Sequence, residues 1–402
     1  MQRIRLLALG AISAVGFTTP ALAQSGQGFN PKISLILDGR YAHFSSDAEA
    51  EIPGFVLGPE TEFAPDGFSI GESELAIESN IDDQFHGWTT IALENEDGET
   101  VVAVEEAYID TLALPYGLAA KVGRFFSDIG YLNRQHPHAW DFTDAPLVYR
   151  AFLAGNLGDD GAQLRWVAPT ELFVEVGAEA LRGAAFPAGG EDRKGVESWT
   201  AFTHVGDDIG SGGSWRAGLW HYDGNAQDRR SGEDVETGFT GDSRISGIDF
   251  IYKWAPQRNP LVRNFVLQAE AMRRSERGTV VYDPDGSSNT SAYDGDQFGG
   301  YVQAVYQFMP RWRVGLRYDR LGANNDLDNP ADDTSLALLA DDGRDPQRWS
   351  AMVDFSNSEF SRLRLQFNRD ETRPSGRPGD QTDNQVFVQY TMSLGSHPAH
   401  QF

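Results

Sequence analysis

Apolar and polar residues alternate along many short stretches of this 402-residue chain. In "QVFVQYTMSL" at residues 385–394, one face carries Val386, Val388, Tyr390, Met392 and Leu394. A period of two residues is the pattern of a β-strand with two unlike faces. Sixteen such stretches begin near Lys32, Phe68, Phe85, Val101, Leu118, Gly161, Leu172, Ser198, Ser214, Arg244, Asn264, Gln297, Arg311, Arg348, Arg362 and Asn384. The pattern predicts an all-β, antiparallel fold.

The connections between these stretches alternate between short and long. Short connections such as "NIDDQ", "LPYG" and "MPR" carry turn residues. Long, Gly- and Asp-rich connections are expected at residues 44–66, 128–160, 183–197, 223–243, 282–296, 321–346 and 371–383, and one tight hairpin, "NEDGE", replaces a long loop. This alternation is typical of a transmembrane β-barrel. We therefore predict one barrel of about sixteen strands over residues 24–402, with no separate plug domain.

The two faces of each expected strand differ in charge. Leu316 shares a face with apolar neighbours, whereas Arg313 and Arg317 lie on the other face. A charge at the lipid midplane costs about 2–4 kcal/mol, so the charged faces should line the interior. Sixteen strands enclose more space than their side chains fill, and we therefore expect a wet lumen.

Charged residues are expected on two opposite walls of this lumen. The acidic wall comprises Glu72, Glu74, Glu78, Glu175 and Glu179. The basic wall comprises Arg313, Arg317, Arg348, Arg362 and Arg364. Two such walls would create a transverse field across a pore for small polar solutes. The alternative is that neighbouring charges pair and only solubilise the interior.

The two ends of the chain indicate export. Residues 1–23 have a basic start, an apolar stretch and an Ala-Leu-Ala site, which together predict a cleaved signal peptide. The last expected strand and Phe402 resemble the signal that outer-membrane barrels present to their assembly machinery, with Tyr390, Met392 and Leu394 as its other members. An edge strand of a soluble sandwich would alternate in the same way.

Composition narrows the classes of protein further. The chain has no cysteine, which excludes disulfides, thiolate zinc sites and cysteine catalysis. Its formal net charge is −26, and the acidic excess lies largely in the expected loops. We expect the outer membrane of a Gram-negative cell, contact with lipid and lipopolysaccharide, and no nucleic-acid partner.

The stretch "NRQHPHAWDF" at residues 133–142 falls in the third long loop. His136 and His138 point the same way if the stretch is extended, and neutral imidazole suits Zn²⁺ or Cu²⁺. If the loop folds into the lumen, both histidines, Asp141 and Asp144 would lie at the constriction and contact divalent metal transiently. Two histidines alone are not a metal site, and Pro137 stiffening a turn is the alternative. No resident cofactor is required.

The segments "GRFFSDIGYLNRQHPHAWDF" and "DDGAQLRWVAPT" and the final His-x-x-His resemble a proteobacterial family of outer-membrane proteins. That family is labelled zinc-regulated TonB-dependent outer-membrane receptor and is also described as porin-like. The resemblance covers nearly all of the mature chain and implies zinc-linked nutrient uptake through His136 and His138, with His397 and His400 as further metal residues. The chain is similar in size to phosphate-selective-type porins, and in general porins the third loop folds inward.

These observations favour a porin-like channel for diffusion or uptake of small polar solutes, linked to zinc or another divalent cation. Few residues separate the expected cleavage site from the first strand, so a plug domain has no room and passive diffusion is predicted. A TonB-dependent receptor for a metal complex and a non-conducting structural or adhesive barrel stay as alternatives. No G-x-S-x-G motif occurs, and we expect neither catalytic residues nor an enzyme. A homotrimer is one candidate assembly.

Overall fold

The computed structural model describes residues 31–45, 52–58, 65–96, 99–190, 193–231, 237–283, 286, 288–328, 339, 345–372 and 382–395. Pro31–Phe402 belongs to one compact unit. The expected signal peptide, His397, His400 and Phe402 lie outside the described residues, so those predictions stay untested.

The described residues form β-strands, short 3₁₀ turns and one short α-helix. The strands are β1 (Lys32–Phe44), β2 (Gly67–Ile70), β3 (Ser73–Asn80), β4 (Phe85–Glu96), β5 (Glu99–Thr111), β6 (Leu118–Phe126), β7 (Gly158–Val167), β8 (Phe173–Leu181), β9 (Ser198–Ile209), β10 (Gly213–Ser231), β11 (Thr237–Trp254), β12 (Asn264–Tyr282), β13 (Asn289–Met309), β14 (Trp312–Leu327), β15 (Gln347–Ser358), β16 (Ser361–Asp370) and β17 (Asp383–Gly395). The helix is α1 (Leu147–Leu153). No helix among the described residues has the length and apolar character needed to cross a membrane.

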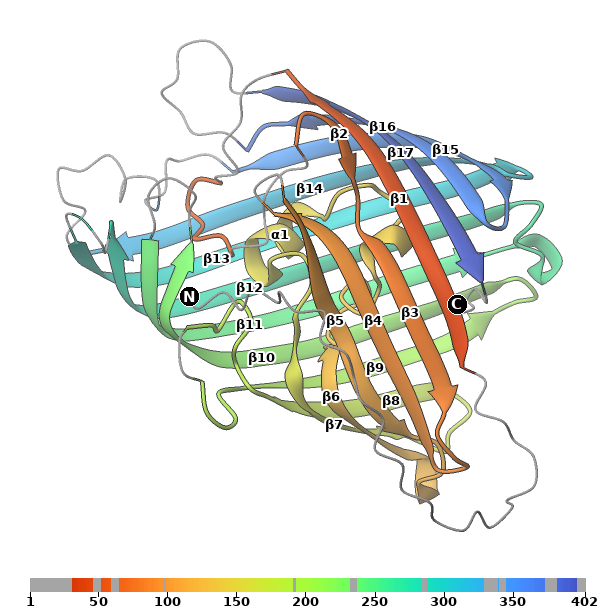
Figure 1. Cartoon of the computed structure of the whole chain (residues 1–402), viewed down its shortest axis with the longest axis horizontal. Helices are drawn as coiled ribbons and strands as arrows, with labels where there is room; N and C mark the ends of the chain where they lie inside the picture. Colours follow the sequence, from red (N-terminus) through yellow and green to blue (C-terminus); the bar gives the residue numbers. More distant parts are fainter. Residues whose placement is uncertain are drawn as a thin grey trace, which may run out of the picture. The chain divides into compact units, whose positions relative to one another are not determined.

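The strands form one closed antiparallel sheet. Neighbouring strands pair in chain order, and β17 pairs with β1 to close the sheet. β2 and β3 both pair with β1 and are two parts of one wall strand, so the described residues form a sixteen-stranded barrel. Figure 1 shows the strands wrapping around α1. The predicted antiparallel barrel of about sixteen strands is confirmed.

A β-bulge separates β2 from β3. Gly39 and Ile36 of β1 pair with Ile70 and Glu74, so three residues on one side oppose two on the other. A side chain at Gly71 would place its Cβ 2.1 Å from a carboxylate oxygen of Asp38, which only glycine avoids. A bulge bends the strand and re-aims its side chains. This bulge positions Glu72, to which the site description returns.

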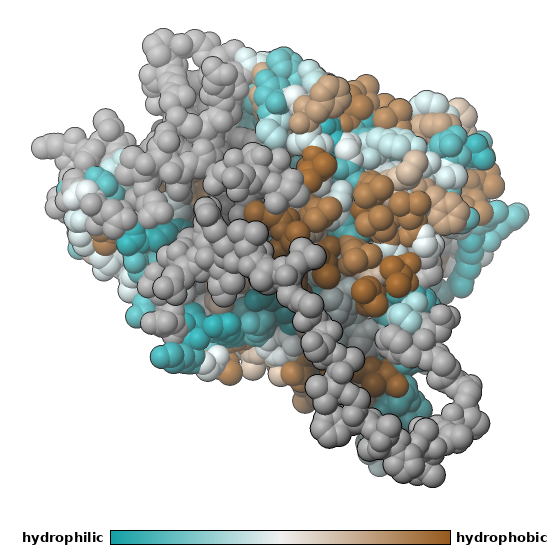
Figure 2. Space-filling view, viewed as in Figure 1, coloured by the Kyte–Doolittle hydropathy of each residue, from teal (hydrophilic) through white to brown (hydrophobic). Residues whose placement is uncertain are grey.

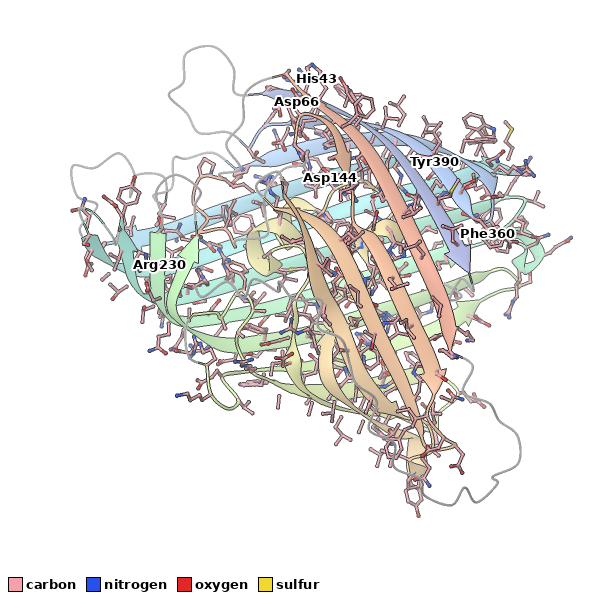
Figure 3. The ribbon with its side chains drawn as sticks, viewed as in Figure 1. His43, Asp66, Asp144, Arg230, Phe360 and Tyr390 are labelled. Atoms are coloured by element: carbon pink, nitrogen blue, oxygen red, sulfur yellow. The ribbon has the colours of Figure 1, made fainter. Side chains whose placement is uncertain are left out.

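The alternating faces follow the sequence pattern. Leu316 and Leu365 are about half exposed on the outside, whereas Arg317 and Arg364 are buried within the barrel. Tyr390, Met392 and Leu394, the expected assembly residues, lie exposed along β17. Figure 2 shows hydrophobic residues gathered over the part of the outer face formed by β1 and β3. Figure 3 places Phe360 at the end with short turns and Arg230 at the end with long connections.

Several strands are longer than their apolar alternation predicts. β10 and β11 extend through most of residues 223–243, and β12 and β13 leave only residues 283–288 between them. The prediction of long loops at 223–243 and 282–296 is therefore wrong in extent. The reason is that the backbone ladder continues where both faces are polar, and there the hydrophobic period carries no signal.

The pairing between β5 and β6 covers fewer residues than the other strand pairings of the wall. β5 and β6 pair over only four residues, Ala107–Asp110 with Lys121–Arg124. Arg124 is the last paired residue of β6. Its guanidinium donates to the carbonyl oxygen of Val104 (3.3 Å) and pairs with Asp160 (2.9 Å). A groove of about 530 Å³ lies at this place. We refer to it as the β5–β6 seam.

Candidate functional site

The connection between β6 and β7, residues 127–157, runs through the inside of the barrel and is called the inner loop here. Its two ends meet, because the backbone N–H of Ser127 donates to the carbonyl oxygen of Leu157 (2.9 Å). The Asn133 side chain donates to the carbonyls of both Ser127 and Leu157, at 2.8 and 3.0 Å. The loop therefore starts and ends as a tightly held neck, with α1 in its second half.

The α1 helix packs in an apolar environment within the barrel. All seven of its residues are buried. Phe55, from the first long connection, contacts Phe152 of α1. Their cluster also includes residues that the barrel wall contributes, namely Phe202, Trp220, Tyr222, Ile245, Met272, Tyr301 and Leu321. The expectation of a wet lumen throughout is wrong for this part of the interior.

A small residue in the wall makes room for the helix. A Cβ added at Gly299 of β13 would lie 2.9 Å from Cγ2 of Val148. The helix N-terminus meets a carboxylate, since the backbone N–H of Leu147 donates to Asp319 Oδ1 at 3.0 Å. A carboxylate at this end of a helix satisfies an unpaired donor and interacts favourably with the helix dipole. These contacts fix α1 against β12–β14.

The histidines of the inner loop contact carboxylates on β3 and β5. His136 Nδ1 lies 3.3 Å from Glu74 Oε2 and 3.2 Å from Glu105 Oε2. His136 Nε2 lies 3.0 Å from Glu106 Oε2. His138 Nδ1 lies 2.6 Å from the other oxygen of Glu74. We call Glu72, Glu74, Glu105, Glu106, His136 and His138 the acid–histidine cluster.

The geometry of this cluster depends on a second β-bulge. Thr90 pairs with Glu106 and Ile91 with Val104, which leaves Glu105 as the extra residue in β5. In a regular strand two successive side chains point to opposite faces. The bulge lets Glu105 and Glu106 both reach the same imidazole ring. Glu72 reaches the cluster from the first bulge, between β2 and β3.

The surrounding charge shifts the titration of His136. Burial alone would lower the pKa of His136, but the nearby Glu74, Glu105 and Glu106 raise that pKa well above its usual value. A carboxylate favours the charged form of a neighbouring imidazole. The three carboxylates therefore favour the protonated form of His136, and their contacts hold the inner loop to β3 and β5.

The other side of the inner loop binds the basic wall. Asp144 Oδ1 lies 2.8 Å from Arg317 Nη2, and its Oδ2 lies 2.9 Å from Arg348 Nη1. Asp141 lies 2.7 Å from Arg313. Burial raises the pKa of Asp144, but Arg348 and Arg317 lower it to well below its usual range. In Figure 3, Asp144 lies among the strands, within the barrel.

Every predicted member of the basic wall contacts the inner loop. Besides the three ion pairs, Arg362 donates to the carbonyl oxygen of His138 (2.6 Å) and Arg364 to that of Trp140 (2.9 Å). A guanidinium offers five donors in a fixed plane, which suits simultaneous binding of carboxylates and carbonyls. The basic wall is thus a docking surface for residues 138–145.

The acidic residues predicted from sequence are not all brought together. Glu74 lies in the acid–histidine cluster, and Glu179 accepts hydrogen bonds from Ser127 and from the backbone of Asp128 at the loop neck. Glu175 instead contacts His204 (3.0 Å), and Glu78 pairs with Lys32 (2.8 Å). The picture of two charged walls facing each other across open water is therefore corrected, because the inner loop bonds to both.

The predicted group of His136, His138, Asp141 and Asp144 is also divided. The two histidines contact the carboxylates of β3 and β5, whereas the two aspartates are paired with arginines. The described residues that could hold a metal ion together are Glu72, Glu74, Glu105 and His136. Sequence reasoning missed Glu105 and Glu106, because strict alternation places them on opposite faces.

A further carboxylate, Glu270 of β12, fixes the middle of the inner loop. Its oxygens accept hydrogen bonds from Tyr149 Oη (2.8 Å) and from the backbone N–H of Leu132 (3.0 Å). Tyr301 Oη adds a third at 2.7 Å. No motif in the sequence marks this residue, since a single glutamate on a barrel strand has many other roles.

Comparisons with known proteins were made for this chain. No family model matches it. An uncharacterised protein of Aquifex aeolicus is 32% identical over 401 residues, covering 94% of this chain and 81% of that protein. Solved structures share the fold at much lower identity.

Three of these structures are a porin, an outer-membrane channel and an outer-membrane protein. An anion-selective porin from Comamonas acidovorans has a TM-score of 0.53 at 10% identity, covering 91% of this chain and 99% of that chain. The outer-membrane channel DcaP of Acinetobacter baumannii has a TM-score of 0.53 at 15% identity, covering 91% and 96%. OmpT of Vibrio cholerae, in a trimer form, has a TM-score of 0.50 at 12% identity, covering 91% and 99%.

These likenesses support one part of the sequence resemblance, the porin-like fold, and not the other. The label of TonB-dependent receptor finds no support in them, because this chain forms a sixteen-stranded barrel and the matched folds are those of a porin and an outer-membrane channel. The interior of this barrel is occupied by a loop between two wall strands, β6 and β7. The porin-like half of the resemblance agrees with the fold.

Proposed function

Because the chain belongs to the same family as the Aquifex aeolicus protein and has the fold of outer-membrane porins, we propose that it is an outer-membrane channel for small polar solutes. The observation that carries the proposal is the inner loop, which runs inside a closed barrel and is bound by polar groups to β3 and β5, to β12 and to β14–β16. Such a loop narrows the water-filled passage through a barrel and leaves the barrel wall itself unchanged.

The outer face supports a membrane location. On β13 the outward residues run from Asp296, paired with Arg273 at 2.6 Å, through Phe298 and Val302 to Tyr306. The apolar part from Phe298 to Phe308 spans ten residue steps, or about 34 Å along the strand. With a usual strand tilt this corresponds to a band about 25 Å tall, the height expected for a barrel in an outer membrane.

A charge placed on this band should destabilise the barrel in lipid. Leu365 of β16 faces outward and is 50% exposed. Replacing it by arginine (Leu365→Arg) is expected to cost about 2–4 kcal/mol of unfolding free energy if the residue lies near the midplane. Urea unfolding in lipid vesicles measures the change. Ser358→Arg, at the β15–β16 turn, is the control and should change little; equal losses would argue against the membrane band.

The channel proposal is tested by planar-bilayer conductance of the refolded mature chain. Discrete single-channel currents, together with heat-modifiable migration on gels, are the expected result. A non-conducting structural or adhesive barrel is the second candidate, because the apolar packing around α1 fills part of the interior. A folded barrel that carries no current would select that candidate.

We also propose passive diffusion, with divalent cations among the solutes that the constriction contacts. Support comes from the two histidines that lie among carboxylates on the inner loop. Uptake that depends on proton-motive force and is lost when TonB is deleted would contradict diffusion. The trimer form of the Vibrio cholerae protein makes a homotrimer the assembly to test first, by crosslinking in detergent.

A further inference from the structure

The acid–histidine cluster gathers four carboxylates around two imidazoles. Within the described residues, no lysine or arginine forms an ion pair with Glu72, Glu74, Glu105 or Glu106. Buried charge without a partner is costly, so the cluster calls for a further cation or for extra protons.

One oxygen in the cluster has no partner. Glu72 Oε1 is inaccessible to solvent and makes no hydrogen bond. One oxygen of Glu72 lies within 4.8 Å of one oxygen of Glu105, and two carboxylates this close repel each other unless a proton or a cation lies between them. A buried acceptor that is left unsatisfied destabilises the fold, and a metal ion bound to it removes this cost.

The spacing of the donor atoms fits a small divalent ion. One oxygen each from Glu72, Glu74 and Glu105 and one ring nitrogen of His136 lie within 4.8 Å of one another. His136 Nδ1 is 3.3 Å from Glu74 and 3.2 Å from Glu105. A tetrahedral ion with bonds of about 2.0–2.1 Å holds its ligand atoms roughly 3.3 Å apart.

The neighbouring contacts resemble the support that metal ligands need. Glu106 accepts from His136 Nε2 at 3.0 Å, which orients the ring and leaves Nδ1 toward Glu74 and Glu105. His138 Nδ1 holds the second oxygen of Glu74 at 2.6 Å. A carboxylate on the far nitrogen of a liganding histidine fixes the ring and makes it a better donor.

We propose that Glu72, Glu74, Glu105 and His136 bind one divalent transition-metal ion, with Zn²⁺ as its representative. Three oxygens alone would suit Mg²⁺ or Ca²⁺, but the imidazole shifts preference to ions that accept nitrogen. The ligands come from the β2–β3 bulge, the β5 bulge and the inner loop, so the ion cross-links the loop to the wall. The site does not depend on conduction; only its effect on a pore rests on the proposed function.

The test is Zn²⁺ binding to the refolded mature chain in detergent micelles, after chelator treatment and removal of the chelator. The chain carries His397→Ala and His400→Ala, so that the tail histidines contribute nothing. Isothermal titration calorimetry should show one Zn²⁺ per chain, undiminished by excess Mg²⁺ or Ca²⁺. Co²⁺ in place of Zn²⁺ should give the visible absorption of a low-coordinate N/O site.

The variants separate ligands from nearby charge. His136→Gln and Glu105→Gln should weaken Zn²⁺ binding at least about a hundredfold, and Glu106→Gln about ten- to a hundredfold. His86→Gln is the matched control, because His86 also lies between two carboxylates, Asp110 at 3.1 Å and Glu78 at 3.6 Å. It should bind Zn²⁺ like the parent chain.

Three results would overturn the site: no Zn²⁺ binding by the parent chain, full binding by His136→Gln, or an equal loss in His86→Gln. Heat-modifiable migration confirms that each variant is folded. If His136→Gln does not fold, Glu105→Gln gives the answer, since it keeps the histidine and the shape of the side chain. A chain that binds Zn²⁺ but carries no current sinks the channel proposal and leaves the metal site standing.

Discussion

Replacing residues 128–156 by an Asn-Gly turn is expected to raise the single-channel conductance several-fold and to admit larger solutes. The neck of the inner loop already has hairpin geometry, because Phe126 pairs with Gly158 and Ser127 bonds to Leu157. A two-residue Asn-Gly turn closes such a pair of strands without strain. Without the loop, the interior of a sixteen-stranded barrel is too wide for wall side chains to fill.

The control for this excision is the same turn placed at Asp82–Asp83, between β3 and β4, which should leave the current as it was. An unchanged current in a heat-modifiable loop variant would show that the inner loop is not the barrier. Excision exposes Trp220 and Met272 to water, so the variant can fail to fold. Asp141→Ala combined with Asp144→Ala then gives the milder test, and noisier, larger currents are expected.

Asp144→Asn should lower the free energy of unfolding by about 3 kcal/mol, the low end of the cost of breaking a buried ion pair. Asp144 bonds to Arg317 and Arg348, whose side chains are almost fully buried, and the substitution leaves both guanidiniums to share one close carboxylate, Asp319, at 3.0 and 3.6 Å. Asp141→Asn is the matched control. Its partner, Arg313, is partly exposed and keeps two bonds to Asp354, so a loss of about 1 kcal/mol is expected.

The Asp144 contribution also predicts a dependence on pH. The pKa of Asp144 is lower in the folded chain than its usual value of about 3.8. A group of this kind stabilises the fold above its unfolded pKa and loses that contribution as pH falls through the folded pKa. Urea unfolding at acid pH should therefore show the parent chain and Asp144→Asn converging below about pH 4. A constant difference down to pH 2 would contradict the role given to this carboxylate.

The wall of the barrel could be predicted because the alternation of apolar and polar residues along each strand shows which residues face lipid and which face the interior. On β14, Leu316 faces out and Arg317 faces in, as alternation requires. The interior could not be predicted in the same way, since a strand pattern does not say what lies opposite. Trp220 and Met272 occupy inward positions that only the presence of α1 explains.

The residues of the candidate site could likewise be predicted only in part. The sequence marks His136 and His138 by their spacing, and Glu74 by its place on an inward face. Glu105 joins them only because a bulge adds one residue to β5, and a bulge leaves no trace in a pattern of alternate residues. The pairing of Asp141 and Asp144 with arginines depends on contacts between segments far apart in the chain.

The β5–β6 seam has a consequence for motion. Four residue pairs join β5 to β6, whereas all nineteen residues of β12 pair with β13, so the seam should open and reclose far more often than the rest of the wall. Amide hydrogens of Lys121–Arg124 should then exchange with solvent before those of β12. Glu105 lies just beyond the paired segment of β5, so each opening would displace a carboxylate that holds His136. Fluctuations of the wall on the microsecond-to-millisecond scale would thus reach the inner loop directly, and the channel current would record them as flicker.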